Sequence, residues 1–595
     1  MQLTDLRWWQ SKKPHEAIRA WLGSVEPWDS GRRSDDEHHL RLYSEREWNL
    51  FTSTDPRRTM RHTYRPRKKL KKSLNVVKNT IDAWVNLISR DRPHVNYLTK
   101  GADWSLQKKA RLRTRFCEAL FHQNKAYALA NRVAKFAGIT GMGAIHIVKA
   151  HGRVFYDLVG LGELVVDPSE AQAGDPRTIM RVRPIDKEVA RERWPAHAKA
   201  IDRAQTIGSG QLLFVDAYHL PSGPDAGDGL HVQALPGVAT LSEREYRWSA
   251  FPIVGFRFDD APVGWHGTGL ADELQGLQLE INSVLQMLGD NVWSGGNLKV
   301  AVPRGSNVAL SALTNALGCP VIEYTGPNPP QFFANDVASP QVFQYLQMLE
   351  QKAYEISGIS QMNAQSQNPF ASMSGRARIV ANQAYSQRFV VSQRRYEDFF
   401  AELADRSLEA AADLEEDGED IEVIFPGRDH LEVIKYSDIA AEAYDFDCQA
   451  WTASLAGETP AARLAHIEQM MSLGMIDLAG AMYLYEVPHD LRAHMEAVLA
   501  PTELAREAID RIIEDGVPMT PTPMMDLQLC AKQAQLWYQR GVLRNVDPAR
   551  LSLLLDFHRM AQELLMRGSP APAAPANDVQ LQGATLPAAP VAMGM

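Results

Sequence analysis

Two stretches of the sequence share an apolar spacing that is typical of helices packed on other helices. In the first, Leu270, Leu274, Leu277, Ile281, Val284 and Leu288 follow alternating steps of four and three residues. In the second, Val342, Leu346, Leu349, Ala353 and Ile356 repeat this spacing, after Ser339 as an N-cap and Pro340 as a first-turn proline. We therefore expect two long helices, 270–294 and 339–357, that form an antiparallel pair around a compact insertion, 295–338.

The chain before this pair divides into a helical and a β-rich part. Residues 1–140 are expected to be mainly helical, with an amphipathic helix that stops at Arg92-Pro93 and another from Ser105 to about Phe136, ended by Gly138. Residues 141–269 are expected to form an antiparallel sheet, because short β-branched and aromatic runs alternate with turn residues. These runs are 144–149, 154–159, 163–167, 178–183, 211–220 and 246–258, with a short helix near 186–194.

The chain after this pair opens with a segment that has no charge. Residues 356–375 are rich in amides and hydroxyls, and a long helix from Arg376 to about Glu416 follows. We expect the arginines at the start of this helix to pair with acids of residues 397–447 of the same chain or of a neighbouring one. Six helices are then predicted, 460–473, 476–487, 491–499, 503–515, 524–540 and 549–567, with glycines 474, 516, 541 and 568 as their C-caps.

The charges are segregated along the chain, whose formal net charge is −9. Residues 1–115 carry 26 Lys and Arg against 13 Asp and Glu, a net +13, which leaves −22 for the remainder. Nine of the basic residues lie between residues 57 and 72 and form either a phosphate-binding strip or a solvated basic face. The four cysteines are at least 82 residues apart, which predicts no disulfide framework and a reducing compartment. We expect no signal peptide and no transmembrane helix.

The sequence lacks the common motifs of catalysis. It has no Gly-Lys dipeptide, so the phosphate-binding loop of nucleotide hydrolases is missing, and it has neither HExxH nor GxSxG. The glycine-rich stretch 138–143 is expected to be a turn between a helix and a strand. The pair Asp259-Asp260 and the Asp445-Phe446-Asp447 segment are expected to be surface carboxylates rather than metal ligands. We expect no enzyme activity, no cofactor and no metal.

The order of these elements resembles the portal protein of tailed bacteriophages, the ring that connects head and tail. The matching residues are Asn75-Val-Val77 with Ile81-Asp82 and Arg92-Pro93, then Leu270-Ala-Asp272 with Gln278 and Ile281-Asn282, and finally Gly358-Ile359-Ser360. The ordered set spans about residues 70 to 455.

The resemblance implies a mixed α+β, mainly helical ring subunit with wing, stem, clip and crown. Residues 1–140 and the β-rich 141–269 would belong to the wing, 270–294 and 339–357 would be the stem helices, and 295–338 the clip. The channel loop and long wing helix would be 358–416, the return strands of the wing 417–458, the helical crown 459–568, and a flexible Ala/Pro tail 569–595.

The resemblance also implies a function. Such a protein forms the ring channel at one capsid vertex, through which double-stranded DNA is packaged and ejected. The expected assembly is a homododecamer whose partners are the terminase large subunit, the major capsid protein, the scaffolding protein and a head-to-tail adaptor. The expected location is the virion, and the host cytoplasm during assembly.

Two sets of residues follow as candidate sites. Stem packing is assigned to Leu270, Leu274, Leu277, Ile281, Leu288, Val342, Leu346 and Leu349. The neutral loop facing DNA is assigned to Gln361, Asn363, Gln365, Ser366, Gln367 and Asn368. Two alternatives stay open: a nucleic-acid enzyme that binds phosphate through residues 57–72, and a helical scaffold that binds only protein.

Overall fold

The computed structural model describes residues 7–44, 74–90, 92–100, 104–172, 176–206, 210–223, 226–261, 264–296, 299–301, 331–333, 340–358, 390–426, 431–440, 446–452, 467–476 and 489–568. The chain is a mixed α/β protein in which about 59% of the described residues are helical. It divides into two compact units: 1–98 with 109–453, and 99–108 with 454–595. No helix in the described ranges is long and apolar enough to cross a membrane.

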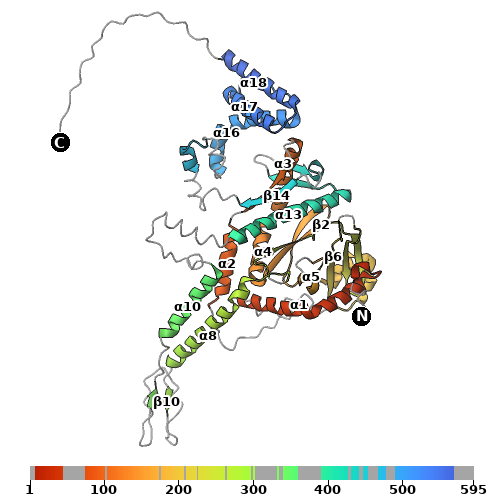
Figure 1. Ribbon diagram of the computed structural model, residues 1–595, viewed down its shortest axis with the longest axis vertical. Coiled ribbons are helices and arrows are strands. Elements are labelled where there is room, and N and C mark those ends of the chain that lie inside the picture. The colour runs from red at the N-terminus through yellow and green to blue at the C-terminus, as the bar shows by residue number, and fades with distance from the viewer. Residues whose placement is uncertain are drawn as a thin grey trace, which may run out of the picture. The chain divides into compact units, whose positions relative to one another are not determined.

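A five-stranded antiparallel sheet forms one part of the first unit (Figure 1). Its order is β4 (Leu164–Val166), β5 (Thr178–Asp186), β6 (Gln211–His219), β7 (Leu230–Leu235) and β8 (Ala239–Glu245). One face carries small and β-branched residues that pack on Ile18, Trp21 and Leu22 of helix α1 (Pro14–Ser44). The alternation of strand residues therefore buries one face under α1 and turns the other face toward the rest of the unit.

A second, three-stranded sheet lies in the main core of this unit. Its order is β3 (Arg153–Leu158), β2 (Met142–Ala150) and β9 (Ile253–Arg257). It packs against α4 (Ala126–Thr140) and α13 (Val390–Glu416), while α2 (Val76–Ile88) packs on α4. Aromatic rings pack between these layers: the buried Phe399 of α13 contacts the buried rings of Phe256 and Phe400.

Small elements complete the unit. Strands β1 (Pro93–Thr99) and β14 (Phe446–Thr452) pair, and β12 (Glu422–Pro426) pairs with β13 (Leu431–Lys435). Three short helices, α5 (Pro168–Gln172), α6 (Lys187–Arg193) and α7 (Ala198–Arg203), lie within the β-rich part. The predicted antiparallel sheet and the short helix near 186–194 are thus confirmed.

A helical hairpin extends from the sheets and helices described above, which form the body of the first unit. Helix α8 (Leu270–Gly296) and helix α10 (Pro340–Ser357) lie side by side, and the antiparallel strands β10 (Lys299–Ala301) and β11 (Gln331–Phe333) lie at their far end (Figure 1). Both helices that the apolar spacing predicts are present.

The second unit is helical where it is described. Helix α16 (His489–Asp510) continues through a π-helical turn, Arg511–Asp515, and is followed by α17 (Leu527–Leu543) and α18 (Pro548–Gly568). Ile509, Cys530, Leu554 and Phe557 form the centre of its core. The separate helices predicted at 491–499 and 503–515 are one helix, because Pro501 sits inside α16 without ending it.

Two helix boundaries in the first unit differ from the prediction. The single helix expected over 105–136 is two helices, α3 (Trp104–Gln123) and α4, because Lys125 takes a left-handed conformation with φ +52° between them. Gly138 does not end α4; Gly141 does, with φ +95°. A Cβ at Gly141 would lie 2.5 Å from the carbonyl oxygen of Gly267, so glycine is required there. The helix-to-strand turn expected over 138–143 is confined to Gly141, because residues 138–140 belong to α4 and residues 142–143 to β2.

Other predictions were wrong in detail. The strand expected over 246–258 is only β9, and β1, β7 and β8 were not predicted. Gly474 and Gly516 end helices with positive φ, whereas Gly541 lies inside α17. A Cβ at Gly541 would lie 2.7 Å from a methyl carbon of Leu551, so this glycine permits the close approach of α18 instead of capping α17.

Candidate functional site: the helical hairpin and its base

The apolar residues of α8 that follow the four-three spacing pack against two neighbours, α10 and the rest of the first unit. Leu270, Leu274, Ile281 and Leu288 are buried, and Leu277 is partly buried. Helix α8 contacts α10 but also α1, α2 and α4 of the body. The apolar spacing that predicts a helix pair therefore also reflects packing of α8 onto the body.

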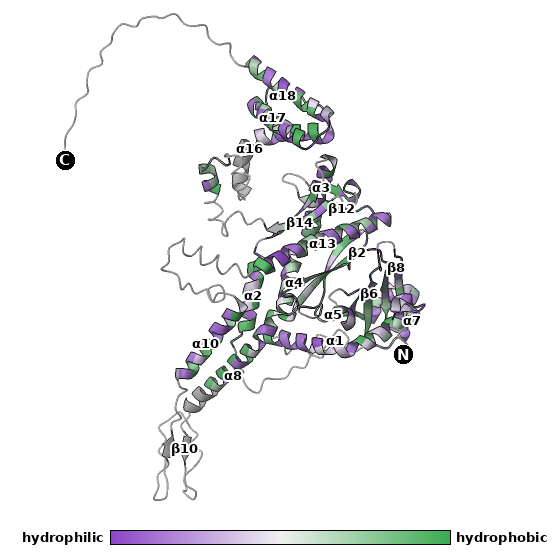
Figure 2. Ribbon diagram, viewed as in Figure 1, coloured by the Kyte–Doolittle hydropathy of each residue, from purple (hydrophilic) through white to green (hydrophobic). Residues whose placement is uncertain are grey.

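Helix α10 has a narrow buried stripe. Leu349 and Ala353 are buried, and Val342 and Leu346 are partly buried against the same core. The large apolar side chains beside this stripe are exposed: Phe343 is 48% exposed, Tyr345 41% and Met348 47%. On α8, Leu279 and Met287 are about half exposed as well. Figure 2 shows hydrophobic and hydrophilic positions alternating along α8 and α10. Exposed apolar side chains on both helices make the hairpin a candidate protein interface.

Gln278 joins the hairpin to the body at its base. Its side chain is 3% exposed, and its Oε1 accepts hydrogen bonds from Val76 N at 2.8 Å and Val77 N at 3.3 Å. Its Nε2 donates to Leu74 O at 2.8 Å and to Asn282 Oδ1 at 3.0 Å. One amide from α8 thus satisfies the first free N–H groups of α2.

Asn75 makes a second joint at the same place. Its Oδ1 accepts from Lys78 N at 2.7 Å as the N-cap of α2, and its Nδ2 donates to the carbonyl oxygens of Leu42 and Tyr43 near the end of α1. The helices α1, α2 and α8 therefore meet at the side-chain amides of Asn75, which is partly buried, and Gln278, which is buried. Sequence inspection singled out Asn75, Gln278 and Asn282 but did not predict that they would meet.

A polar cluster fixes α1 and α4 on the other side of α2. Tyr43 Oη donates to Asp82 Oδ1 at 2.7 Å, and Lys135 Nζ lies 3.1 Å from the same oxygen. Burial and the hydrogen bond to Asp82 raise the pKa of Tyr43, so its hydroxyl keeps its proton at neutral pH. Asp82, also singled out in the sequence, thus bridges three helices.

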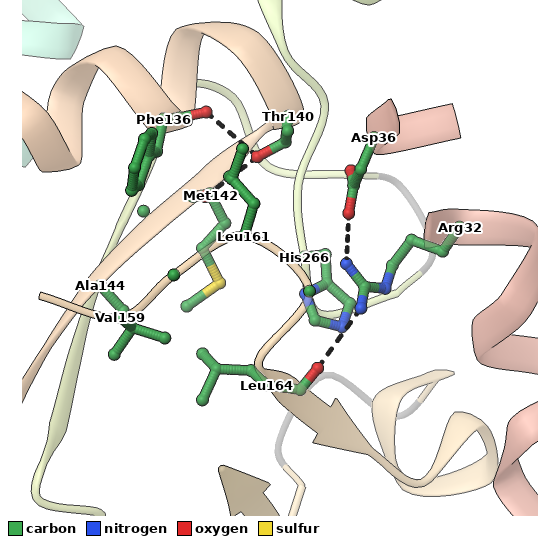
Figure 3. A pocket seen from close by; sticks show the side chains of 13 residues that line it. Arg32, Asp36, Phe136, Thr140, Met142, Ala144, Val159, Leu161, Leu164 and His266 are labelled. Atoms are coloured by element: carbon green, nitrogen blue, oxygen red, sulfur yellow. Dashed lines mark hydrogen bonds and ion pairs between the residues drawn. The ribbon is translucent and has the colours of Figure 1, made fainter. Parts of the chain in front are cut away.

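Helix α1 also carries buried charge near the start of α8 (Figure 3). Arg32 lies between Asp36 Oδ2, at 2.7 Å, and the carbonyl oxygen of Leu164, at 3.3 Å, beside a cavity of about 30 Å³ that His266 also lines. Burial raises the pKa of Asp36 to about 6 despite the attraction of Arg32. One turn further along α1, His39 Nε2 lies 3.5 Å from Asp272 Oδ1 in the first turn of α8.

The charge of α8 is acidic. It carries no Lys or Arg and four acids, Asp272, Glu273, Glu280 and Asp290. The first two stand in the first turn, where their negative charge interacts favourably with the positive end of the helix dipole. Helix α10 carries Glu350, Lys352 and Glu355. In the described helices α8 and α10 there is therefore no cluster of positive charge for a nucleic acid.

The position of Arg395 corrects one expectation. Arg395 Nη2 lies 3.0 Å from Asp259 Oδ1 and 3.1 Å from Asp260 Oδ2, and Arg395 Nη1 donates to Phe258 O at 2.6 Å. It therefore pairs with the end of β9 and not with acids of residues 397–447. The carboxylate pair Asp259-Asp260 is at the surface, as expected, but it anchors α13.

The candidate channel residues Gln361, Asn363, Gln365, Ser366, Gln367 and Asn368 lie outside the described residues, as do the basic strip 57–72 and the tail 569–595. Among the residues that are described, no group of three or more His, Cys, Asp or Glu side chains is arranged to hold a metal ion. No protein-family model matches the chain, and no curated protein matches it.

Proposed function

We propose that this chain is the subunit of a portal ring of a tailed bacteriophage, a passive conduit for double-stranded DNA. The observation that carries the proposal is the hairpin of α8 and α10, which extends from an α/β body, carries a small β element at its far end and leaves Phe343, Tyr345 and Met348 exposed. In a ring, neighbouring hairpins would cover these side chains.

The dimensions of such a ring suit DNA. Twelve helices side by side, each roughly 10 Å wide, form a circle roughly 38 Å across the helix axes with a lumen of roughly 28 Å. A B-form duplex passes through an opening of this size. The acids of α8 suit a sliding polymer, because each ion pair to a phosphate would add affinity and slow its passage.

The remaining roles follow from this assignment. The loop with Gln361, Asn363, Gln365, Ser366, Gln367 and Asn368 would contact DNA through neutral groups. The terminase large subunit would supply the energy of packaging, and the capsid protein, scaffolding protein and adaptor would bind the ring. Purified rings should turn over no ATP above the blank rate.

Electron microscopy of the full chain tests the proposal. Hollow rings support it, whereas isolated globules contradict it. The variant Phe343→Ser with Met348→Ser should form fewer rings, because both side chains are exposed within one subunit and neither is needed for its core. The matched control, Gln344→Ser with Gln347→Ser, changes exposed polar residues of the same helix and should form rings normally.

A packaging assay tests the channel loop. Gln365→Lys with Gln367→Lys should leave the ring intact but slow packaging in a salt-dependent way, since each subunit would add phosphate contacts. The control Gln365→Asn with Gln367→Asn keeps the loop neutral and should package at the normal rate. Divalent-dependent nuclease activity of a monomer would favour the nucleic-acid enzyme instead, and rings that never admit DNA would favour the protein-only scaffold.

A further inference from the structure

The five-stranded sheet has a polar face that borders a cavity. Directly opposed residues in an antiparallel sheet point to the same side. One such row crosses four strands as Arg181, Asp216, Gln233 and Ser242, and the next row contains Tyr218, His231 and Arg244. The alternate residues, such as Val182 and Val215, pack under α1.

This polar face forms the floor of a cavity of about 400 Å³ in the first unit. Strand β2, residues 245–248 and the last residues of α13 line the remaining sides. A cavity of this volume lies in the range of small-molecule sites.

The floor of the cavity offers hydrogen-bond acceptors. Asp216 is 1% exposed, its Oδ1 accepts from Gln233 Nε2 at 2.9 Å, and its Oδ2 has no hydrogen-bond partner in the described structure. Arg183 Nη2 lies 3.5 Å from that oxygen and balances its charge. Burial alone would raise the pKa of Asp216, but contact with His231 and the neighbouring positive charges lower it to about 2, so it is a carboxylate at neutral pH.

Aromatic rings and a second unsatisfied atom lie beside this carboxylate. His231 stacks on Tyr218 with centroids 4.2 Å apart, and its buried Nε2, 3.7 Å from Asp216 Oδ1, has no hydrogen-bond partner in the described structure. The floor can thus bind the hydrogen-bonding groups of a ligand next to a flat ring surface.

The mouth of the cavity offers positive charge. Arg244 lies 3.6 Å from Asp417 and Arg247 lies 3.7 Å from Glu416, while Arg247 Nη2 donates a long hydrogen bond of 3.4 Å to Glu245 Oε2; all of these side chains are more than half exposed. Arg193 forms no hydrogen bond or ion pair with any described residue and lies over the ring of Trp194. Guanidinium groups bind phosphate through paired N–H donors, and exposed ion pairs of this kind exchange readily.

We propose that this cavity binds a nucleotide-sized phosphomonoester, with its phosphate at Arg193, Arg244 and Arg247 and its polar body on Asp216, Gln233 and His231. The site lies on the sheet and not on the hairpin, so it stands or falls independently of ring formation. The ligand is either a free nucleotide or the 5′-terminal nucleotide of a DNA strand.

Calorimetric titration of the full chain at low salt tests the site. The probes are the four deoxynucleoside 5′-monophosphates, inorganic phosphate and a short 5′-phosphorylated single strand. At least one mononucleotide should bind, and more tightly than inorganic phosphate. Tighter binding of the strand than of any mononucleotide identifies the strand end as the ligand, and the reverse order identifies the free nucleotide.

Variants assign the two ends of the ligand. Arg193→Gln with Arg244→Gln should weaken nucleotide binding about tenfold or more for each guanidinium lost. Arg191→Gln, on the same helix but outside the cavity, is the matched control and should bind normally. His231→Phe keeps a ring against Tyr218 and should lose the preference for nucleotide over inorganic phosphate.

Three results would overturn the proposal. The first is the absence of binding by all four mononucleotides at millimolar concentration. The second is equal affinity for nucleotides and inorganic phosphate. The third is unchanged affinity in the Arg193→Gln, Arg244→Gln variant, with melting temperatures used to establish that each variant is folded.

Discussion

Replacement of Gln278 by leucine is the sharpest test of how the hairpin is held. The side chain is 3% exposed and makes four hydrogen bonds, three of them to the backbone of residues 74–77. Leucine has a similar volume, so it fills the space and leaves no room for water. Gln278→Leu therefore leaves the N–H of Val77 without a partner, and it leaves the N–H of Val76 and the carbonyl of Leu74 with only their mutual bond of 3.1 Å.

The expected loss follows from the cost of those unpaired groups. A buried backbone group without a partner, here the N–H of Val77, costs about 1–3 kcal/mol, and each of the two lost bonds of 2.8 Å contributes about 0.5–1.5 kcal/mol, which together give about 2–6 kcal/mol. Leucine recovers part of this through its apolar contacts with the surrounding core. We expect a net loss of about 3 kcal/mol in the free energy of unfolding of the first unit.

Hydrogen exchange measured by mass spectrometry provides the assay. Amides of the peptide that contains Val76 and Val77 should exchange about 100-fold faster in the Gln278→Leu variant, because every 1.4 kcal/mol is about tenfold. Gln275→Leu is the matched control: this residue lies one turn earlier on α8 and bonds only to Asp272 of the same helix, at 2.9 Å. If both variants exchange alike, Gln278 does not hold α2 and the reasoning fails.

Three further predictions concern assembly, the tail and pH. Leu277→Asp with Leu349→Asp should impair ring assembly. An unchanged ring yield in mass-resolved scattering would contradict a role of the apolar rows of α8 and α10 in assembly. Truncation after Gly568 should leave the melting temperature and the ring unchanged, because a segment so poor in large apolar residues cannot offset its ordering entropy; a large drop would show that the tail is docked. Asp36→Asn should increase the free energy of unfolding more at pH 7.5 than at pH 4, by a difference on the order of 1–3 kcal/mol. The pKa of Asp36 is raised to about 6, so the protonated carboxyl stabilises the fold at low pH, and that contribution is lost as the pH rises through 6. An equal effect of Asp36→Asn on the unfolding free energy at both pH values would contradict this last prediction.

The periodicity of apolar residues along the chain was enough to predict several of the helices. The four-three spacing from Leu270 to Leu288 predicted α8, and the same spacing with Ser339 and Pro340 predicted α10. The amphipathic run before Arg92-Pro93 predicted α2. In each case the signal lies within one element, because a helix that buries one face must repeat apolar residues at its own period.

Contacts between segments far apart in the sequence could not be predicted from such patterns. Gln278 and Val76 are 202 residues apart, and nothing in either stretch shows that one amide side chain will cap the other helix. The break between α3 and α4 was likewise hidden, since Lys125 has no sequence preference that announces a left-handed conformation.

The helical hairpin, the β-rich region and the segregation of charge could be read from the sequence, since these depend on residue type and spacing along the chain. That the polar rows of β5 to β8 face a cavity, with Asp216 and His231 on its floor, became visible in the folded chain. The strand pattern of alternating polar and apolar residues is the same whether the polar face meets water or other elements. Which of the two it meets depends on β2 and α13, whose placement is set by the packing of the whole unit.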